Sequence, residues 1–536
     1  MSEPGRVAEW ADATRRGAAF VDGLFHHLRH PLTLEQARTA LAARRVRRDA
    51  DLLAVARQAI FRNPRSPYRF LLRHAGCEYG DLERLVRTEG VEGALQELFR
   101  QGVYLTAAQV KGHEPVVRGP ERITVGLPKL RSPSWRVPGP MLGPEDRAGK
   151  RVSIYRALVQ DVVINARLAL DVRGGTSWRH AVWGYPNDAW LLWLVRFWGP
   201  GIRPARWFSR LDPRASPVAI ERWVTRVLPS MTRWAGVPLP PIEHAPLSAP
   251  QVIVSWLGTE LGAGRRPHLV AAPSSAVHLC RMARAQGLEL HGVELTLTGE
   301  PITAARDAAI RSTGAGLTTS YGAKEAGIMG YGCLRPTEVD ELHCYDDSHV
   351  FVQPGPGGAV PGLPPDALLV TCLRPSWPYV ALNLSLGDRG TLTRRACGCP
   401  MESLGWTEHL HTVRSFEKLK VGGVLFLERE ITGLIDEVLP ARFGGAPTDY
   451  QLVVDDEVID GALRLKLLVH PAVGPLDEPT VRAQVLASLA EAGVPVAALW
   501  REPRWLTVER AAPLSTGRGK ILHVHRVERR PEGHRG

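Results

Sequence analysis

Lysine is scarce in this sequence, and basic charge is not clustered. Only eight of the 67 basic residues are lysines, and the arginines are scattered through segments rich in alanine, glycine and proline. A net charge of +12 would favour nucleic-acid binding if it were gathered on one face. Because the arginines are spread as a general compositional bias would spread them, we expect no nucleic-acid partner.

Long apolar runs are also missing. The most hydrophobic aromatic stretch, "WLLWLVRFW" at residues 190–198, has about half of the 20 residues needed to span a bilayer, and Arg196 interrupts it. The opening residues "MSEPGRVAEWADATRRGAAF" lack the apolar segment of a signal peptide. We therefore expect a cytoplasmic protein without membrane contact, whose seven cysteines are thiols or metal ligands rather than a disulfide framework.

The length and texture of the chain predict two or three domains. Residues 1–115 favour helix, because apolar residues recur there every three or four positions. From about residue 120, runs that favour strands ("HLVAAP", "VELTLTG", "ALLVTCL", "RVSIY") alternate with helices such as "SSAVHLCRMARAQG". This alternation predicts an α/β core domain over 116–413 with a mixed or largely parallel sheet. Residues 414–536 have the pattern of a smaller α+β domain.

The motifs of several common enzyme classes are absent. There is no Gly-x-Ser-x-Gly elbow, no Gly-x₄-Gly-Lys-Ser/Thr loop and no His-Glu-x-x-His pair. Instead, four short stretches bring glycines and polar residues to turns. The first, Gly299-Glu300-Pro301, ends a predicted strand and exposes backbone to a flat ligand. The second, "TTSYGAKEAG", offers the ring of Tyr321 and the carboxylate of Glu325, which suits a metal ion or a ligand cation.

The other two stretches lie further along the chain. "LSLGDRG" presents Asp388, an acceptor for the vicinal hydroxyls of a sugar, and "GRGK" ends in Lys520. Each stretch alone is a common kind of turn. In this order and at these separations, the four stretches resemble the motifs of the adenylate-forming superfamily. The general sequence pattern around them resembles the phenylacetate-CoA ligase-like branch of that superfamily. The resemblance covers about residues 270–525.

The resemblance implies an ATP-dependent acid ligase with a large N-terminal domain and a mobile C-terminal domain. The nucleotide-binding set that it implies is Gly299, Glu300, Pro301, Tyr321, Gly322, Asp388 and Arg414. Within this set Tyr321 would stack on adenine, Asp388 would bind the ribose hydroxyls and Arg414 would start the hinge. Glu325 would hold Mg²⁺, and Lys520 would reach the substrate carboxylate and the α-phosphate, where an ammonium offsets the repulsion between two anions.

Three departures from the family pattern are visible. The phosphate-binding loop expected within residues 130–150 is missing, and the four prolines there lack the N–H groups that cradle phosphates. Lys324 replaces the usual threonine, and Phe416 replaces a usual acidic residue at the hinge. One hypothesis is that Lys324 acts with Glu325 and Lys520 in catalysis, by supplying the positive charge that the lost loop does not. The alternative is that the protein has lost the ability to catalyse a reaction of ATP.

Cysteine and histidine residues indicate a separate metal site. Cys333, His343, Cys397 and Cys399 offer three thiolates and one imidazole, which suit a tetrahedral structural Zn²⁺. Relatives in the phenylacetate-CoA ligase-like branch have a similar arrangement, which supports the interpretation. Cys344 and His349 are possible substitute ligands. The alternative without a metal is that the cysteines are small residues of the hydrophobic core.

The sequence thus predicts an enzyme that activates an aryl or acyl carboxylic acid as an acyl-adenylate. The expected cofactors are ATP, Mg²⁺ and a structural Zn²⁺. CoA is the default acceptor by resemblance, with a carrier protein or an amine as alternatives. A second hypothesis is a catalytically degenerate relative that binds a nucleotide or acyl ligand and serves as a partner or scaffold.

Overall fold

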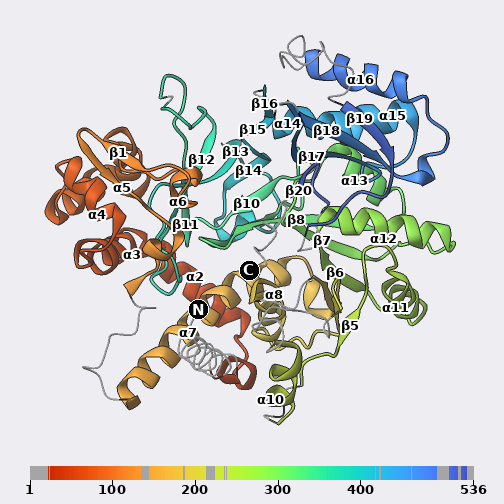
Figure 1. The fold of residues 1–536 in the computed structure, drawn as a ribbon. Coiled ribbons are helices and arrows are strands. Elements are labelled where there is room, and N and C mark those ends of the chain that lie inside the picture. The colour runs from red at the N-terminus through yellow and green to blue at the C-terminus, as the bar shows by residue number, and fades with distance from the viewer. Residues whose placement is uncertain are drawn as a thin grey trace, which may run out of the picture.

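The computed structural model describes residues 22, 25–133, 144–184, 188–212, 224–234, 236, 238–358, 360–416, 418–421, 424–459, 462–491, 506–516 and 521–527. Figure 1 shows a central sheet flanked by helices, with the last part of the chain forming a separate smaller unit beside it. None of the helices in these ranges combines the length and the hydropathy that a bilayer crossing demands.

Residues 25–123 are mostly helical, as the spacing of their apolar residues predicts. The elements of this segment are α2 (Leu34–Val46), α3 (Arg48–Val55), a π-helix (Ala56–Phe61), α4 (Pro67–His74), α5 (Tyr79–Arg100), α6 (Ala107–Val110) and the hairpin of β1 (Val116–Arg118) and β2 (Glu121–Ile123). Leu52 of α3 and Leu98 of α5 share one hydrophobic core with Leu369 and Leu384 of the sheet. These helices therefore bury their apolar faces against the sheet.

One mixed sheet of twelve strands runs through the described residues, in the order β11-β12-β13-β14-β10-β9-β8-β7-β6-β3-β4-β5. The parallel half consists of β3 (Arg179–Trp183), β4 (Arg206–Ser209), β5 (Ile242–His244), β6 (Pro267–Ala271), β7 (Glu294–Thr298) and β8 (Gly316–Ala323). The antiparallel half consists of β9 (Gly327–Gly332), β10 (Leu342–Cys344), β11 (His349–Val352), β12 (Ala367–Cys372), β13 (Leu384–Arg394) and β14 (Glu408–Ser415).

Helices cover both faces of the parallel half. One face packs against α7 (Pro144–Val172), α8 (Asp188–Trp198) and α10 (Leu228–Trp234). The other face packs against α11 (Gln251–Gly262), α12 (Pro273–Ala285) and α13 (Ala304–Arg311). Because both faces are covered, the strands can be apolar along their whole length, and every residue of Pro267–Ala271 is buried.

The α/β fold class predicted from the sequence is confirmed. Of the two expected forms of the sheet, mixed or largely parallel, the mixed form is present, since half of the sheet is antiparallel. The segment "RVSIY" (151–155) is not a strand but part of the 29-residue helix α7. A five-residue apolar window is too short to distinguish a buried strand from a helix, and here the longer helical context decides the conformation.

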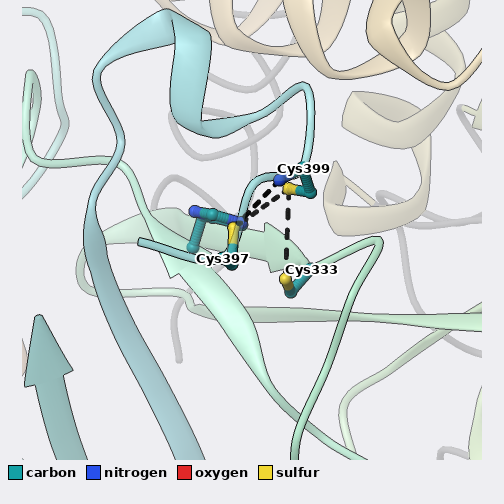
Figure 2. Close-up of side chains that lie close together, drawn as sticks. Cys333, Cys397 and Cys399 are labelled. Carbon is teal, nitrogen blue, oxygen red and sulfur yellow. Dashed lines mark hydrogen bonds between the residues drawn. The ribbon is translucent and has the colours of Figure 1, made fainter. Parts of the chain in front are cut away.

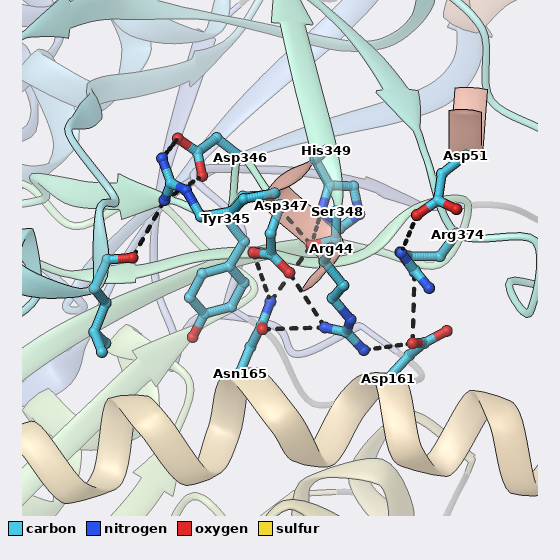
Figure 3. A network of polar contacts seen from close by, with 12 residues as sticks. Arg44, Asp51, Asp161, Asn165, Tyr345, Asp346, Asp347, Ser348, His349 and Arg374 are labelled. Atoms are coloured by element: carbon cyan, nitrogen blue, oxygen red, sulfur yellow. Dashed lines mark hydrogen bonds and ion pairs between the residues drawn. The ribbon is translucent and has the colours of Figure 1, made fainter. Parts of the chain in front are cut away.

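A buried network of charges fastens the N-terminal helices to the rest of the molecule (Figure 3). Arg44 of α2 pairs with Asp161 of α7, and its Nη1 lies 3.2 Å from Oδ2 of Asp347, in the turn before β11. Arg374, which follows β12, pairs with Asp51 of α3 at 2.7 Å and also with Asp161. The buried guanidinium of Arg44 and the partly buried one of Arg374 thus each have carboxylate partners, which offset the cost of removing their charges from water.

The C-terminal residues form an α+β unit with its own core. Its elements are β15 (Lys418–Val421), β16 (Val424–Leu427), α14 (Glu428–Gly433), a π-helix (Leu434–Val438), α15 (Leu439–Phe443), β17 (Tyr450–Ile459), β18 (Ala462–Val469), α16 (Glu478–Glu491), β19 (Leu506–Arg510) and β20 (Val524–Val527). A four-stranded sheet in the order β19-β18-β17-β20 packs against these helices through residues such as Leu452, Leu467 and Val485. In Figure 1 this unit lies beside α12 and α13.

Candidate functional site

A pocket of about 240 Å³ opens where the middle of the large sheet meets the C-terminal unit. It is lined by Gly299, Glu300, Pro301, Ile302, Arg306, Thr319, Ser320, Tyr321, Gly322, Asp340, Leu342, Asp388, Val413, Ser415, Ile521, Leu522 and His523. Every member of the nucleotide-binding set expected from the sequence is among them except Arg414. Gly299 follows β7 with a φ of 83°, a left-handed conformation that favours glycine and exposes the backbone of the turn.

Tyr321 and Asp388 meet inside this pocket. The Tyr321 hydroxyl, on β8, donates a hydrogen bond of 2.7 Å to Oδ2 of Asp388, on β13. Burial and the neighbouring Asp388 carboxylate raise the pKa of Tyr321 well above its ordinary value, so the hydroxyl keeps its proton and acts as the donor. The pair therefore places an aromatic face and an oriented carboxylate side by side.

Glu300 contributes its backbone to the pocket, because its carboxylate is used elsewhere. That carboxylate accepts hydrogen bonds from the backbone N–H of Ser274 at 3.0 Å and from its hydroxyl at 2.9 Å, at the start of α12. It also pairs with Arg306 at 3.2 Å, and both side chains are 2% exposed. The side chain thus fixes the turn after β7 rather than facing a ligand.

Arg414 lies next to the pocket and holds its rim. Its Nη1 donates to Oδ2 of Asp340 at 2.8 Å, and its Nη2 donates to the carbonyl of Ile302 at 3.1 Å. Asp340 also accepts the backbone N–H groups of Thr412 at 2.8 Å and Val413 at 3.2 Å. Thr412 has a φ of 54°, which is costly for a β-branched residue, so these bonds keep β14 in an unusual local conformation.

Two of the three expected catalytic residues, Lys324 and Glu325, are not among the described residues that line the pocket. Lys324 and Glu325 lie on the turn between β8 and β9, where Lys324 is exposed and Glu325 is partly buried. Lys520 lies outside the described residues, as do residues 134–143 of the segment expected to hold a phosphate loop. The residues directly after Lys520, at 521–523, form part of the pocket wall.

Sequence reasoning missed Arg306, Asp340 and His523 as pocket residues. Arg306 belongs to the buried face of α13, and Asp340 precedes β10 in "TEVDELH". His523 follows Lys520 by three positions, which is the one signal of its place available in the sequence. All three are brought to the pocket by folding of distant segments, which no local pattern encodes.

The four predicted zinc ligands come together at one point, and Figure 2 shows the three cysteines among them. Their ligand atoms all lie within 4.8 Å of one another, and the four residues are buried. Sγ of Cys333 is 4.0 Å from Sγ of Cys399, and Nε2 of His343 is 3.2 Å from Sγ of Cys399 and 3.7 Å from Sγ of Cys397. Zn–S bonds of about 2.3 Å in a tetrahedron place sulfurs about 3.8 Å apart, so this donor set fits zinc. Cys344 and His349, the substitutes considered, lie outside this set.

The surroundings of His343 orient it as a ligand. Its Nδ1 donates to the carbonyl of Trp406 at 2.6 Å, which leaves Nε2 facing the sulfurs. Burial lowers the pKa of His343 to about 4, so the imidazole is neutral, as metal binding requires. The indole N–H of Trp406 donates to Oδ1 of Asp347 at 3.1 Å, which links this cluster to the network of Figure 3.

A second group, Cys333, Glu341 and His409, shares one cysteine with the first. Its carboxylate is already satisfied, because Glu341 pairs with Arg395 at 2.7 Å and lies 2.7 Å from Nδ1 of His409. Thr337 donates to the same carboxylate through its backbone and its hydroxyl. Glu341 therefore acts as a structural anchor beside the first group rather than as a further ligand set.

No protein-family model matches this sequence, and no curated protein sequence matches it either. Among solved structures, a 2-hydroxyisobutyryl-CoA ligase in the postadenylation state is similar over 93% of this chain and 90% of its own, at 16% identity and a TM-score of 0.49. An anthranilate CoA ligase with anthranoyl-AMP is 14% identical over 67% of this chain and 62% of its own, with a TM-score of 0.37. McyG A-PCP with phenylalanyl-adenylate is 10% identical over 68% of this chain and 61% of its own, with a TM-score of 0.38. At these values the similarities do not assign an activity to this chain.

Proposed function

We propose that this protein is an adenylate-forming ligase that activates a carboxylic acid with ATP and passes the acyl group to an acceptor. The observation that carries the proposal is the pocket in which Tyr321, Asp388 and the backbone of residues 299–301 meet. An adenosine group needs a surface for its flat base, backbone groups at the edge of the base and an acceptor for its ribose hydroxyls. This pocket offers all three.

In the proposed reaction, a carboxylate oxygen of the acid attacks the α-phosphorus of ATP. The bond from that phosphorus to the bridging oxygen breaks, pyrophosphate leaves, and an acyl-adenylate forms. A thiol or amine then attacks the acyl carbon and AMP leaves. Tyr321 and Asp388 hold the nucleotide through both steps, and the turn at residues 299–301 fixes its base.

The attack brings two anions together, so cations are needed beside the pocket. We assign this role to Lys520, whose neighbours at 521–523 line the pocket, and to Lys324 on the turn after β8. Glu325 follows Lys324 and offers a partly buried carboxylate, which fits an oxygen ligand for Mg²⁺. When bound there, Mg²⁺ would neutralise phosphate charge.

The same proposal extends to the acceptor of the acyl group, to the functional units of the chain and to the metal site. CoA is the first acceptor to test, followed by a carrier protein or an amine, and the acid is an aryl or acyl carboxylic acid, as in the phenylacetate-CoA ligase-like branch. We propose residues 1–115, 116–413 and 414–536 as the functional units, with the last one mobile and Arg414 at its start. The Cys333, His343, Cys397 and Cys399 cluster holds a structural Zn²⁺ in this proposal, because four protein ligands leave no open position for catalysis.

Calorimetric titration with Mg-ATP tests the proposal without knowledge of the acid. We expect saturable binding by the natural protein and no measurable binding by Asp388→Ala, which loses the ribose acceptor. Glu121→Ala is the control, since Glu121 pairs with Arg73 on the exposed hairpin β1–β2, at 49% and 68% side-chain exposure. If the natural protein binds ATP, an ATP–pyrophosphate exchange screen of carboxylic acids follows, with Lys520→Ala as the inactive control.

Absence of binding at millimolar Mg-ATP would contradict the ligase proposal. It would favour the degenerate relative that holds an acyl ligand or a protein partner. Unchanged ATP affinity in Asp388→Ala would mean that the nucleotide binds outside this pocket. That result would also contradict the proposal, because the proposal depends on the pocket as the nucleotide site.

A further inference from the structure

A buried cluster of charges joins the large sheet to the C-terminal unit directly behind the pocket. Arg306, on α13, is its centre. Its Nε lies 3.0 Å from Oδ2 of Asp436, its Nη1 lies 3.2 Å from Oε2 of Glu300, and its Nη2 lies 2.9 Å from Nε2 of His523. Nε2 of His523 is also 3.0 Å from Oδ1 of Asp436, and the Thr303 hydroxyl donates to Oδ2 of Asp436 at 2.9 Å.

The members of this cluster come from both sides of the boundary. Glu300, Thr303 and Arg306 belong to the turn after β7 and to α13, whereas Asp436 and His523 belong to the C-terminal unit. The side chains of Arg306 and Asp436 are 2% and 0% exposed, so water does not compensate either charge. Burial acts to raise the pKa of Asp436, but the charge of the Arg306 guanidinium and the hydrogen bonds to the carboxylate outweigh it and hold that pKa below its ordinary value. The carboxylate is therefore ionised, and its partner lies across the boundary.

The cluster also decides the shape of the pocket. Glu300, Arg306 and His523 line the pocket themselves, and His523 continues directly from Ile521 and Leu522, which form the wall on that side. Arg306 further contacts the carbonyl of Pro301 at 3.4 Å, in the turn expected to lie against a base. One guanidinium thus contacts both walls of the pocket, the turn after β7 and the segment before β20.

We propose that Arg306 and Asp436 are positioning residues that dock the C-terminal unit on the pocket and so complete its nucleotide-binding form. Residues 521–523 form a wall of the pocket only while Asp436 holds Arg306. Ligand affinity and docking of the C-terminal unit are therefore linked, so a change that weakens docking also weakens ligand binding. Separation of the two units would leave the Asp436 carboxylate without its guanidinium, which favours the docked state. The nucleotide part of this inference rests on the proposed function, whereas the docking part does not.

The test combines two measurements on the full chain. Hydrogen–deuterium exchange without ligand reports docking through peptides that cover residues 428–440 and 521–527, and calorimetry reports Mg-ATP affinity. Asp436→Asn keeps the shape of the side chain and removes its charge. Arg306→Lys keeps one charge but cannot bridge Glu300, Asp436 and His523 at once. The matched control is Arg281→Gln, which breaks the ion pair of Arg281 with Asp449 across the same boundary without touching a lining residue.

We expect Asp436→Asn to speed exchange in residues 521–527 and to weaken ATP binding by about 30-fold, as loss of one partner of a buried charge pair does. Arg306→Lys should change both quantities in the same direction. Exchange in the strand residues 450–454 and 465–469 should stay slow, which shows that the unit remains folded. Arg281→Gln should leave ATP affinity within about twofold, because neither Arg281 nor Asp449 lines the pocket.

The outcomes separate the two proposals. If Asp436→Asn and Arg306→Lys leave exchange at 521–527 unchanged, the docking role is wrong, whatever the protein binds. If Arg281→Gln weakens ATP binding as much as they do, the effect belongs to the interface as a whole and not to this cluster. If exchange responds as expected but the natural protein does not bind Mg-ATP, docking by Arg306 and Asp436 stands and the nucleotide function fails.

Discussion

The Tyr321 hydroxyl donates a 2.7 Å hydrogen bond to Asp388 although 67 residues separate the two in the chain. The sequence predicts a separate ligand contact for each, and the structure makes them one unit. β8 carries Tyr321 and β13 carries Asp388, and these strands are not neighbours in the sheet. The Tyr321 hydroxyl therefore has a role of its own beside that of the ring, because it holds one carboxylate oxygen of Asp388 in place.

Tyr321→Phe tests this relationship. The ring remains available for stacking, but Oδ2 of Asp388 loses its donor. We expect Mg-ATP affinity to fall by about tenfold, which corresponds to one hydrogen bond to a charged group. The preference for ATP over 2′-deoxy-ATP, measured by the same titration, should shrink as well, since a misplaced carboxylate no longer selects the ribose hydroxyls. An affinity loss with an unchanged preference would mean that the hydroxyl acts on something other than Asp388.

Asp340→Ala should destabilise the protein more than an exposed change does. The Asp340 carboxylate is buried, accepts two backbone N–H groups of β14 and pairs with Arg414. Its removal leaves these donors without an acceptor, at a cost of about 2–4 kcal/mol. Denaturant unfolding measures this, with Glu121→Ala expected to cost less than about 1 kcal/mol. Equal costs for the two variants would contradict the role given to Asp340.

Metal content tests the cysteine cluster. Protein purified without chelator should carry close to one zinc per chain, and Cys397→Ser should carry much less, because serine is a poor zinc ligand at neutral pH. Cys372→Ser is the control, since Cys372 is buried on β12 outside the cluster. A zinc content that is the same in Cys397→Ser and the natural protein would contradict the site.

Loss of zinc should also reach the N-terminal helices. His343 contacts the carbonyl of Trp406, the indole of Trp406 contacts Asp347, and Asp347 pairs with Arg44 of α2. We therefore expect chelation to speed hydrogen exchange in α2, measured by mass spectrometry. Exchange in β17 and β18, which lie in another unit, should not change. Equal acceleration in both places would indicate general unfolding instead.

The buried His349 predicts a loss of stability in mild acid. Burial lowers its pKa to about 4, from an ordinary 6.5, while its Nε2 donates to the carbonyl of Ala326. Between these values the unfolded chain binds a proton that the folded chain does not, so stability falls as pH falls from 6.5 to 4 and this contribution is constant below that. The loss is about 3 kcal/mol for the full shift. Urea unfolding at several pH values should show a shallower slope for His349→Gln, and an identical slope would be inconsistent with a neutral buried imidazole.

The local sequence pattern predicted helices and strands well where these are long and their apolar residues recur at regular intervals. The expected helix "SSAVHLCRMARAQG" at 274–287 corresponds to Pro273–Ala285, and the C-terminal strands and helices match the α+β prediction. It failed at "RVSIY", because five apolar residues do not distinguish a strand from the helix that surrounds them. It also could not tell that half of the sheet is antiparallel, since strand direction depends on connections between strands rather than on their composition.

By itself, the sequence predicted the α/β class, six of the residues that line the pocket and the four members of the cysteine and histidine cluster, because those depend on residue type, local turns and order along the chain. Only the tertiary structure decided that Tyr321 bonds Asp388, that the Glu300 side chain serves α12 and Arg306 instead of the pocket, and that His523 and Asp436 meet Arg306 behind it. The physical reason is that, apart from the Glu300–Arg306 pair, these contacts form between groups 26 to 217 positions apart. Their energies depend on burial and geometry, which exist only once the chain has folded.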